Sequence, residues 1–175
     1  MQGGKPMELT WNEFGANKQE GYELLFEMAK ALAEGEPHPL ANLANLAALL
    51  GEALPEINWA GFYLMHQGEL LLGPFWGKPA CLHIALGRGV CGTAAATGKV
   101  QRVEDVHAFP GHIACDAASA SEIVLPLYAA GKLVGVLDID SPHKGRFTTE
   151  DEEGLTRLAA WIGESSDWSL CGYTL

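Results

Sequence analysis

Two pairs of apolar segments, each joined by a turn of two or three residues, constrain the fold of this chain more than any other feature. The first pair covers residues 58–66 and 70–75, and the second covers residues 122–129 and 132–140. Segments this close together pair as antiparallel hairpins, because a parallel connection needs a dozen or more residues. The sequence therefore predicts a sheet that is largely antiparallel.

Helical patterns surround these hairpins. Apolar side chains recur at helical spacing in four segments, which are residues 18–33, 39–51, 90–97 and the stretch that begins after Thr148. The first two form an N-terminal pair of consecutive helices, and Thr148 with Asp151 resembles a capping box for the last one. Short strands are expected near 82–85 and 100–103. Hairpins with helices gathered on one side predict an α+β fold.

Composition excludes several classes of protein. The 175 residues carry a net charge of −11, with 48% hydrophobic and 19% charged residues. These values are typical of one globular domain rather than a disordered chain. The acidic balance argues against nucleic-acid binding and against a basic membrane-surface helix, and no apolar run approaches about 18 residues. We expect no membrane partner and no nucleic-acid partner.

The ends of the chain differ from its centre. Residues 1–8 lack an apolar signal core and read as a flexible leader, which predicts a cytoplasmic protein. Residues 9–168 are expected to form one domain, and residues 169–175 a tail. Pro126 inside the first strand of the second hairpin predicts a sheet edge or a bulge there.

Four cysteines call for an explanation: Cys81, Cys91, Cys115 and Cys171. A cytosolic chain of this size does not use them as a disulfide scaffold. A lone cysteine is usually a small buried hydrophobe, but three cysteines within 35 positions, two of them in irregular segments, weaken that interpretation. Cys91 lies in the first turn of a predicted helix, where the peptide dipoles favour a thiolate.

A metal site is the competing interpretation. The chain offers suitable zinc ligands at Cys81, His83, Cys91, His107, His112 and Cys115. No Cys-x-x-Cys pair is present, however, and the spacings match no common structural zinc template. The prediction is that no metal is bound. His107 and His112 are solvated loop histidines or helpers in forming a nearby thiolate.

Three carboxyl groups are expected on one face of the second hairpin. Asp138 and Asp140 are two residues apart on an apolar strand, and Glu122 opens the strand that pairs with it. One interpretation makes Asp140 a turn cap and Glu122 a solvated strand end. The other is a half-buried cluster in which burial and repulsion raise the pKa values, so that one carboxyl keeps its proton at neutral pH or the cluster holds an ammonium group.

Four stretches of the chain resemble the free methionine-(R)-sulfoxide reductases. They are GPFWGKPAC at 73–81, GRGVCGT at 87–93 with the alanines that follow, DVHAFPGHIACD at 105–116, and SEI at 121–123 together with LDIDSP at 137–142. The resemblance implies a GAF-like fold. It also implies reduction of free L-methionine-(R)-sulfoxide to methionine, with electrons from thioredoxin, no metal or organic cofactor, and a homodimer.

The resemblance also implies roles for individual residues. Cys115 matches the attacking cysteine, Cys81 the resolving cysteine, and Cys91 a third cysteine that is a second candidate for resolving. Glu122, Asp138 and Asp140 match the acidic substrate-binding cluster, with Glu122 or Asp140 as the proton donor. Cys171 has no counterpart.

The substrate contacts complete this expectation. Trp59 matches a pocket wall near the substrate methyl group, and Tyr63 is expected beside it. Backbone N–H groups at Ile113 and Ala114 are expected to bind the substrate carboxylate. The alternatives are a GAF-type ligand-binding or redox-sensing module without turnover, and a structural subunit with inert thiols.

Overall fold

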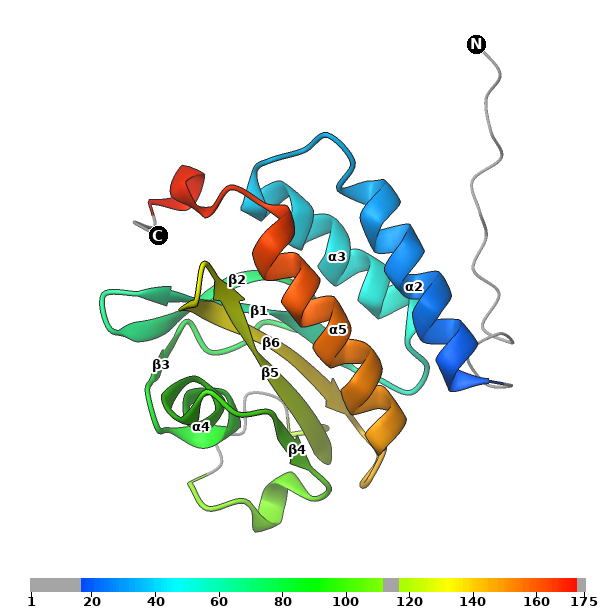
Figure 1. Ribbon diagram of the computed structural model, residues 1–175. Helices are drawn as coiled ribbons and strands as arrows, with labels where there is room; N and C mark the ends of the chain where they lie inside the picture. The colour runs from blue at the N-terminus through cyan, green and yellow to red at the C-terminus, as the bar shows by residue number, and fades with distance from the viewer. Residues whose placement is uncertain (1–16, 112–116, 173–175) are drawn as a thin grey trace.

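The computed structural model describes residues 17–111 and 117–172 and has an α+β architecture (Figure 1). Its sheet has the strand order β3-β2-β1-β6-β5-β4, and every neighbouring pair of strands is antiparallel. Both predicted hairpins are present, as β1 with β2 and β5 with β6. The predicted fold class is confirmed.

The elements follow the sequence pattern closely. The helices are α2 (Lys18–Leu32), α3 (Pro39–Ala53), α4 (Gly89–Thr97) and α5 (Thr149–Ser165), with short 3₁₀ helices η1 (Val106–Ala108) and η2 (Trp168–Cys171). The strands are β1 (Trp59–His66), β2 (Glu69–Gly77), β3 (His83–Ala85), β4 (Gln101–Val103), β5 (Ser121–Ala129) and β6 (Lys132–Ser141). Within the described ranges, no helix has both the length and the apolar character needed to cross a membrane.

One face of the sheet carries the larger apolar core. Helices α2, α3 and α5 cover this face, as predicted for the N-terminal helix pair and the C-terminal helix (Figure 1). Helix α5 approaches β5 closely at Gly163, where a Cβ atom would lie 1.9 Å from the carbonyl oxygen of Tyr128. Trp168 of η2 is fully buried in the same core and donates a hydrogen bond from Nε1 to the Gly163 carbonyl.

A buried ionic network joins α2 to the start of α5. Asp151 is 1% exposed and accepts hydrogen bonds from the Lys18 ammonium at 2.6 Å, the Tyr22 hydroxyl at 2.8 Å and the Thr148 backbone N–H at 2.7 Å. The Arg146 guanidinium lies 3.1 Å from the same carboxylate. Burial alone would raise the pKa of Asp151, but these donors and cations lower it to about 2. The predicted capping box is therefore also an ion-pair centre.

The opposite face of the sheet is covered by α4 and by the segment between β2 and β3. A smaller apolar cluster here includes Trp59, Tyr63, Val90 and Cys91. Helix α4 ends at Gly98, which adopts the left-handed conformation with φ 65°. This second face holds the carboxyl groups singled out in the sequence.

Pro126 lies where the sheet accommodates a proline. Strand β5 is internal, but β4 pairs with it only as far as Val124, so β5 is locally an edge at Pro126. A register shift follows between Leu127 and Tyr128. Both features that the proline predicted, an edge and a bulge, occur there.

Candidate functional site

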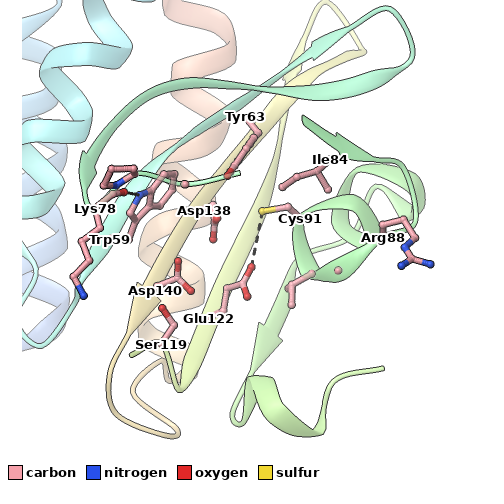
Figure 2. A pocket seen from close by; sticks show the side chains of 14 residues that line it. Trp59, Tyr63, Lys78, Ile84, Arg88, Cys91, Ser119, Glu122, Asp138 and Asp140 are labelled. Atoms are coloured by element: carbon pink, nitrogen blue, oxygen red, sulfur yellow. Dashed lines mark hydrogen bonds between the residues drawn. The ribbon is translucent and has the colours of Figure 1, made fainter. Parts of the chain in front are cut away.

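The register of three neighbouring strands places the site residues in a row. Trp59 on β1 is directly opposite Asp140 on β6, and Asp140 is directly opposite Glu122 on β5. Because paired residues share a face of the sheet and side chains alternate along a strand, Asp138 lies on this same face. The prediction that the three carboxyl groups come together is confirmed (Figure 2).

These residues line a pocket that is partly open to solvent, with about 560 Å³ of space between its walls when the solvent at its mouth is included. Residues from both sheet and helix form its walls: Trp59, Tyr63, Lys78, Pro79, Ala80, Ile84, Arg88, Gly89, Val90, Cys91, Ser119, Glu122, Asp138 and Asp140. Figure 2 shows the three carboxylates directed toward the space between the sheet and α4.

Burial sets the protonation of the carboxyl groups. Glu122 and Asp138 are each 6% exposed, so the interpretation of Glu122 as a solvated strand end is wrong. Loss of hydration and the charges of Asp138 and Asp140 raise the pKa of Glu122 well above its usual range. Burial likewise raises the pKa of Asp138, to about 7. The expectation of a carboxyl that keeps its proton near neutral pH is consistent with these directions.

Cys91 lies at the same cluster. Its Sγ atom donates a long hydrogen bond to Glu122 Oε1 at 3.9 Å. Burial, followed by the charges of Asp138 and Glu122, raises the pKa of this thiol well above its ordinary value. The prediction that the helix dipole favours a thiolate at Cys91 is therefore wrong, because desolvation and two carboxylates outweigh the dipole.

The two aromatic side chains hold the segment that carries Cys81. Trp59 donates from Nε1 to the Lys78 carbonyl at 3.1 Å, and the Tyr63 hydroxyl donates to the Cys81 carbonyl at 3.0 Å. The two rings stack, with centroids 6.0 Å apart. Both aromatic residues line the pocket, as predicted. Cys81 is partly buried and directly follows the wall residue Ala80 in the chain.

Three predicted site residues, Ile113, Ala114 and Cys115, lie outside the described residues. The described chain resumes at Ala117 and reaches the pocket wall at Ser119. The Ser119 hydroxyl accepts a hydrogen bond from Asn58 Nδ2 at 3.1 Å, and Ala120 N–H donates to the Ser141 carbonyl at 2.7 Å. These contacts fix the segment that follows Asp116 against β6.

The residues that could bind a metal differ from the cysteines and histidines that the sequence offers as zinc ligands. In the described part of the chain, the thiol of Cys91 and the carboxylates of Glu122 and Asp138 have ligand atoms within 4.8 Å of one another. His83, which the sequence offered as a ligand, instead pairs with Glu69 on the exposed edge at 2.7 Å.

Several wall residues are not predicted from the sequence. Lys78 and Arg88 belong to stretches that carry the family resemblance but are not predicted as site residues, and Ser119 belongs to none of those stretches. The two hydrogen bonds that fix residues 78–81 were also not expected. Only the pairing of distant segments reveals them.

Comparison with known proteins gives a consistent result. The GAF domain family model matches residues 38–165. A protein of Escherichia coli strain K12 named free methionine-R-sulfoxide reductase is 61% identical over 146 residues, which cover 83% of this chain and 88% of the relative.

Two solved structures of free methionine-R-sulfoxide reductases are similar to this chain in both fold and sequence. The free methionine-R-sulfoxide reductase of Neisseria meningitidis, solved in complex with its substrate, superimposes with a TM-score of 0.84 at 41% identity, covering 90% of this chain and 95% of that one. The fRMsr structure of Staphylococcus aureus, also a complex with substrate, has a TM-score of 0.80 at 51% identity, covering 83% and 95%.

Proposed function

Because this chain belongs to the free methionine-R-sulfoxide reductases, which are oxidoreductases built on the GAF domain, we propose that it reduces free L-methionine-(R)-sulfoxide to L-methionine. One observation carries the proposal. A pair of buried carboxyl groups with raised pKa values lies beside an aromatic wall in a pocket that is partly open to solvent. This is the environment that a sulfoxide needs, since its sulfur is a poor electrophile until its oxygen is protonated.

The proposed chemistry begins at Cys115. Its thiolate attacks the sulfoxide sulfur while a protonated carboxyl donates to the oxygen, methionine leaves, and Cys115 becomes a sulfenic acid. A second thiol then condenses with the sulfenic acid, which forms a disulfide and releases water. Thioredoxin reduces that disulfide by thiol–disulfide exchange, so two electrons enter for each sulfoxide reduced and no metal or organic cofactor takes part.

Glu122 is the proposed proton donor. It is more buried than Asp140, and the two neighbouring carboxylates favour its protonated form. A carboxyl group that keeps its proton can donate it to the sulfoxide oxygen. Asp138 and Asp140 are then the partners of the substrate ammonium group.

The aromatic wall accounts for the apolar end of the substrate. Trp59 and Tyr63 line the pocket, and their apolar rings are the proposed contacts of the methyl and methylene groups. A peptide-bound methionine sulfoxide has an amide in place of the ammonium, so it would leave the buried carboxylates without a cation. Backbone N–H groups at Ile113 and Ala114 are proposed to bind the carboxylate.

Cys81 is the proposed resolving thiol. The pKa of Cys91 is raised by burial and by two carboxylates, and a protonated thiol is a poor nucleophile. Cys81 is partly exposed and lies on a segment fixed by the Tyr63 hydroxyl. We propose a homodimer and a cytoplasmic location from the family resemblance.

Turnover of the two sulfoxide epimers tests the proposal. We expect methionine to form from the R epimer alone, with dithiothreitol or thioredoxin as the reductant. Cys115→Ser should abolish turnover and keep substrate binding. Cys81→Ser should release methionine once and then recycle slowly with thioredoxin, whereas Cys171→Ser, which removes a thiol outside the pocket, should behave as the wild type. Tight binding without turnover would contradict the proposal and support a sensor.

A further inference from the structure

Three side chains at the base of the pocket come from three different elements and present metal-binding atoms to one another. Cys91 lies on α4, Glu122 on β5 and Asp138 on β6. Their ligand atoms all lie within 4.8 Å of one another, and Cys91 Sγ is 3.9 Å from Glu122 Oε1 (Figure 2). All three residues are at most 6% exposed.

A second observation indicates that this cluster is built to receive a cation. Asp138 Oδ1 is buried and meets no N–H or hydroxyl donor among the described residues, so its carboxylate depends on the protons of Glu122 and Cys91, which a metal would displace. Buried carboxylate oxygens are normally paired, because leaving one unpaired costs free energy. Figure 2 shows the charged ends of Lys78 and Arg88, the cationic side chains among the wall residues drawn, directed away from the three groups.

We propose that Cys91, Glu122 and Asp138 form a binding site for a thiophilic divalent cation of the zinc class, and that its occupation blocks the pocket. A thiolate and two carboxylates are ligands that zinc accepts, and pocket water can supply a fourth ligand. In a tetrahedral zinc site a thiolate sulfur and a carboxylate oxygen lie about 3.6 Å apart, because the Zn–S and Zn–O bonds are about 2.3 and 2.1 Å long. The 3.9 Å separation of Cys91 and Glu122 is close to this spacing, and the three ligand atoms, all within 4.8 Å of one another, would draw together around the ion.

Binding at this site is an exchange of protons for the metal. One Zn–S bond and two Zn–O bonds form, and the thiol proton leaves to solvent together with any proton that the carboxyl pair holds. No group is oxidised or reduced. The metal replaces the positive charge that the described side chains do not supply.

Inhibition is the functional consequence, and this part alone rests on the proposed function. The cation and the substrate ammonium both require Asp138, and a metal on Glu122 removes the proposed proton donor. Zinc is therefore expected to compete with the sulfoxide and to be reversed by a chelator.

Cobalt binding to the reduced protein tests the site without turnover. We expect Co²⁺ to produce a thiolate-to-metal charge-transfer absorption that Zn²⁺ displaces. Cys91→Ser should abolish this absorption, and Asp138→Asn should weaken zinc binding by at least about tenfold, as the loss of a ligand exceeds the usual effect of an outer hydrogen-bond partner. Cys171→Ser is the matched control, because it removes a thiol outside the pocket, and it should leave the absorption unchanged.

Several outcomes would overturn the proposal. An absorption that survives Cys91→Ser, or one that disappears only in Cys115→Ser, would assign the metal to another thiol. Absence of the absorption in the wild type would reject the site outright, and circular dichroism shows whether each variant is folded. These measurements use no substrate, so a failure of the metal site and a failure of the reductase proposal are separate results.

Discussion

Two buried acidic centres lie on opposite sides of the sheet, and they differ in whether a cation accompanies them. Asp151, on the side covered by α2 and α5, has Lys18 and Arg146 within 3.1 Å, and its pKa is lowered to about 2. For Glu122 and Asp138, on the pocket side, the ionisable groups that act on them among the described residues are each other, Asp140 and the Cys91 thiol, and burial raises the pKa values of both carboxyl groups.

The contrast separates a structural charge from a functional one. A buried carboxylate whose cations come from the protein is satisfied before any ligand arrives, so it joins elements together. A buried carboxyl pair without such a cation keeps protons that it can donate, or receives a cation from outside. Three predictions test this contrast and a fourth tests the segment that carries Cys81, in order of decreasing effect.

Glu122→Gln should cause the largest change. The amide keeps the shape of the side chain but cannot donate the acidic proton, so kcat should fall by about 10²–10⁴, the usual contribution of a general acid. Steady-state methionine formation with thioredoxin measures this effect.

Stability provides the control for Glu122→Gln. Burial disfavours the charged form of Glu122, so replacing this side chain with a neutral amide should not lower the free energy of unfolding near pH 8. If the variant kept its kcat within threefold, or about 0.6 kcal/mol, Glu122 would not be the proton donor.

Asp151→Asn should change stability rather than catalysis. It leaves the Arg146 and Lys18 charges without their partner, and breaking a buried ion pair costs about 3–5 kcal/mol. Urea unfolding gives the free energy of unfolding, and kcat of the remaining folded protein should be nearly unchanged. Glu150→Gln alters an exposed acid in the same helical turn and should change stability by less than about 0.5 kcal/mol. Equal effects of the two variants would contradict the contrast.

The pH dependence of stability should have opposite signs at the two centres. The pKa of Asp138 rises on folding to about 7, so the folded state holds more protons between about pH 4 and 7. The contribution of Asp138 to stability is complete below its pKa in the unfolded state, and it is lost as the pH rises through its pKa in the folded state. For Asp151, whose pKa falls on folding, stability is present above about pH 4 and is lost as the pH falls toward 2.

Asp138→Asn therefore should flatten the fall in the free energy of unfolding between pH 4 and 7. Each unit of pKa difference corresponds to about 1.4 kcal/mol. Denaturant titrations at several pH values compare the variant with the wild type. An unchanged slope in the variant would mean that Asp138 titrates normally in the folded protein.

Tyr63→Phe should produce the smallest change. It removes the hydrogen bond to the Cys81 carbonyl and keeps the ring in the pocket wall. A lost hydrogen bond is worth about 1 kcal/mol, so disulfide formation should slow by about fivefold while the first release of methionine is unchanged. Rapid quenching with a thiol-alkylating reagent separates the two steps. Tyr128→Phe, which alters a half-exposed tyrosine, is the control. A defect confined to the release of methionine would instead assign Tyr63 to the reduction of the sulfoxide.

The sequence predicts local structure better than it predicts electrostatics. Short turns specify the hairpins, and the Thr148–Asp151 pattern specifies the start of α5, because these signals depend on neighbours in the chain. The alternation of side chains also predicts correctly that Glu122, Asp138 and Asp140 share a face.

What the sequence does not predict depends on contacts between distant segments. The position of Cys91 in its helix predicts an acidic thiol, but α4 packs over two carboxyl groups that come from β5 and β6. The sequence pattern identifies Asp151 only as a capping residue, although Lys18, 133 positions away, is its ion-pair partner. The charges that decide each pKa come from elsewhere in the chain.

The row formed by Trp59, Asp140 and Glu122 has a consequence for protein engineering. Strand register, not a loop, sets the spacing of these side chains, and the hairpin turn and the apolar side chains elsewhere on the strands maintain that register. A library of substitutions at the three positions would therefore vary the chemistry of the pocket on a constant framework. Selection for other oxidised amino acids has a natural starting point there.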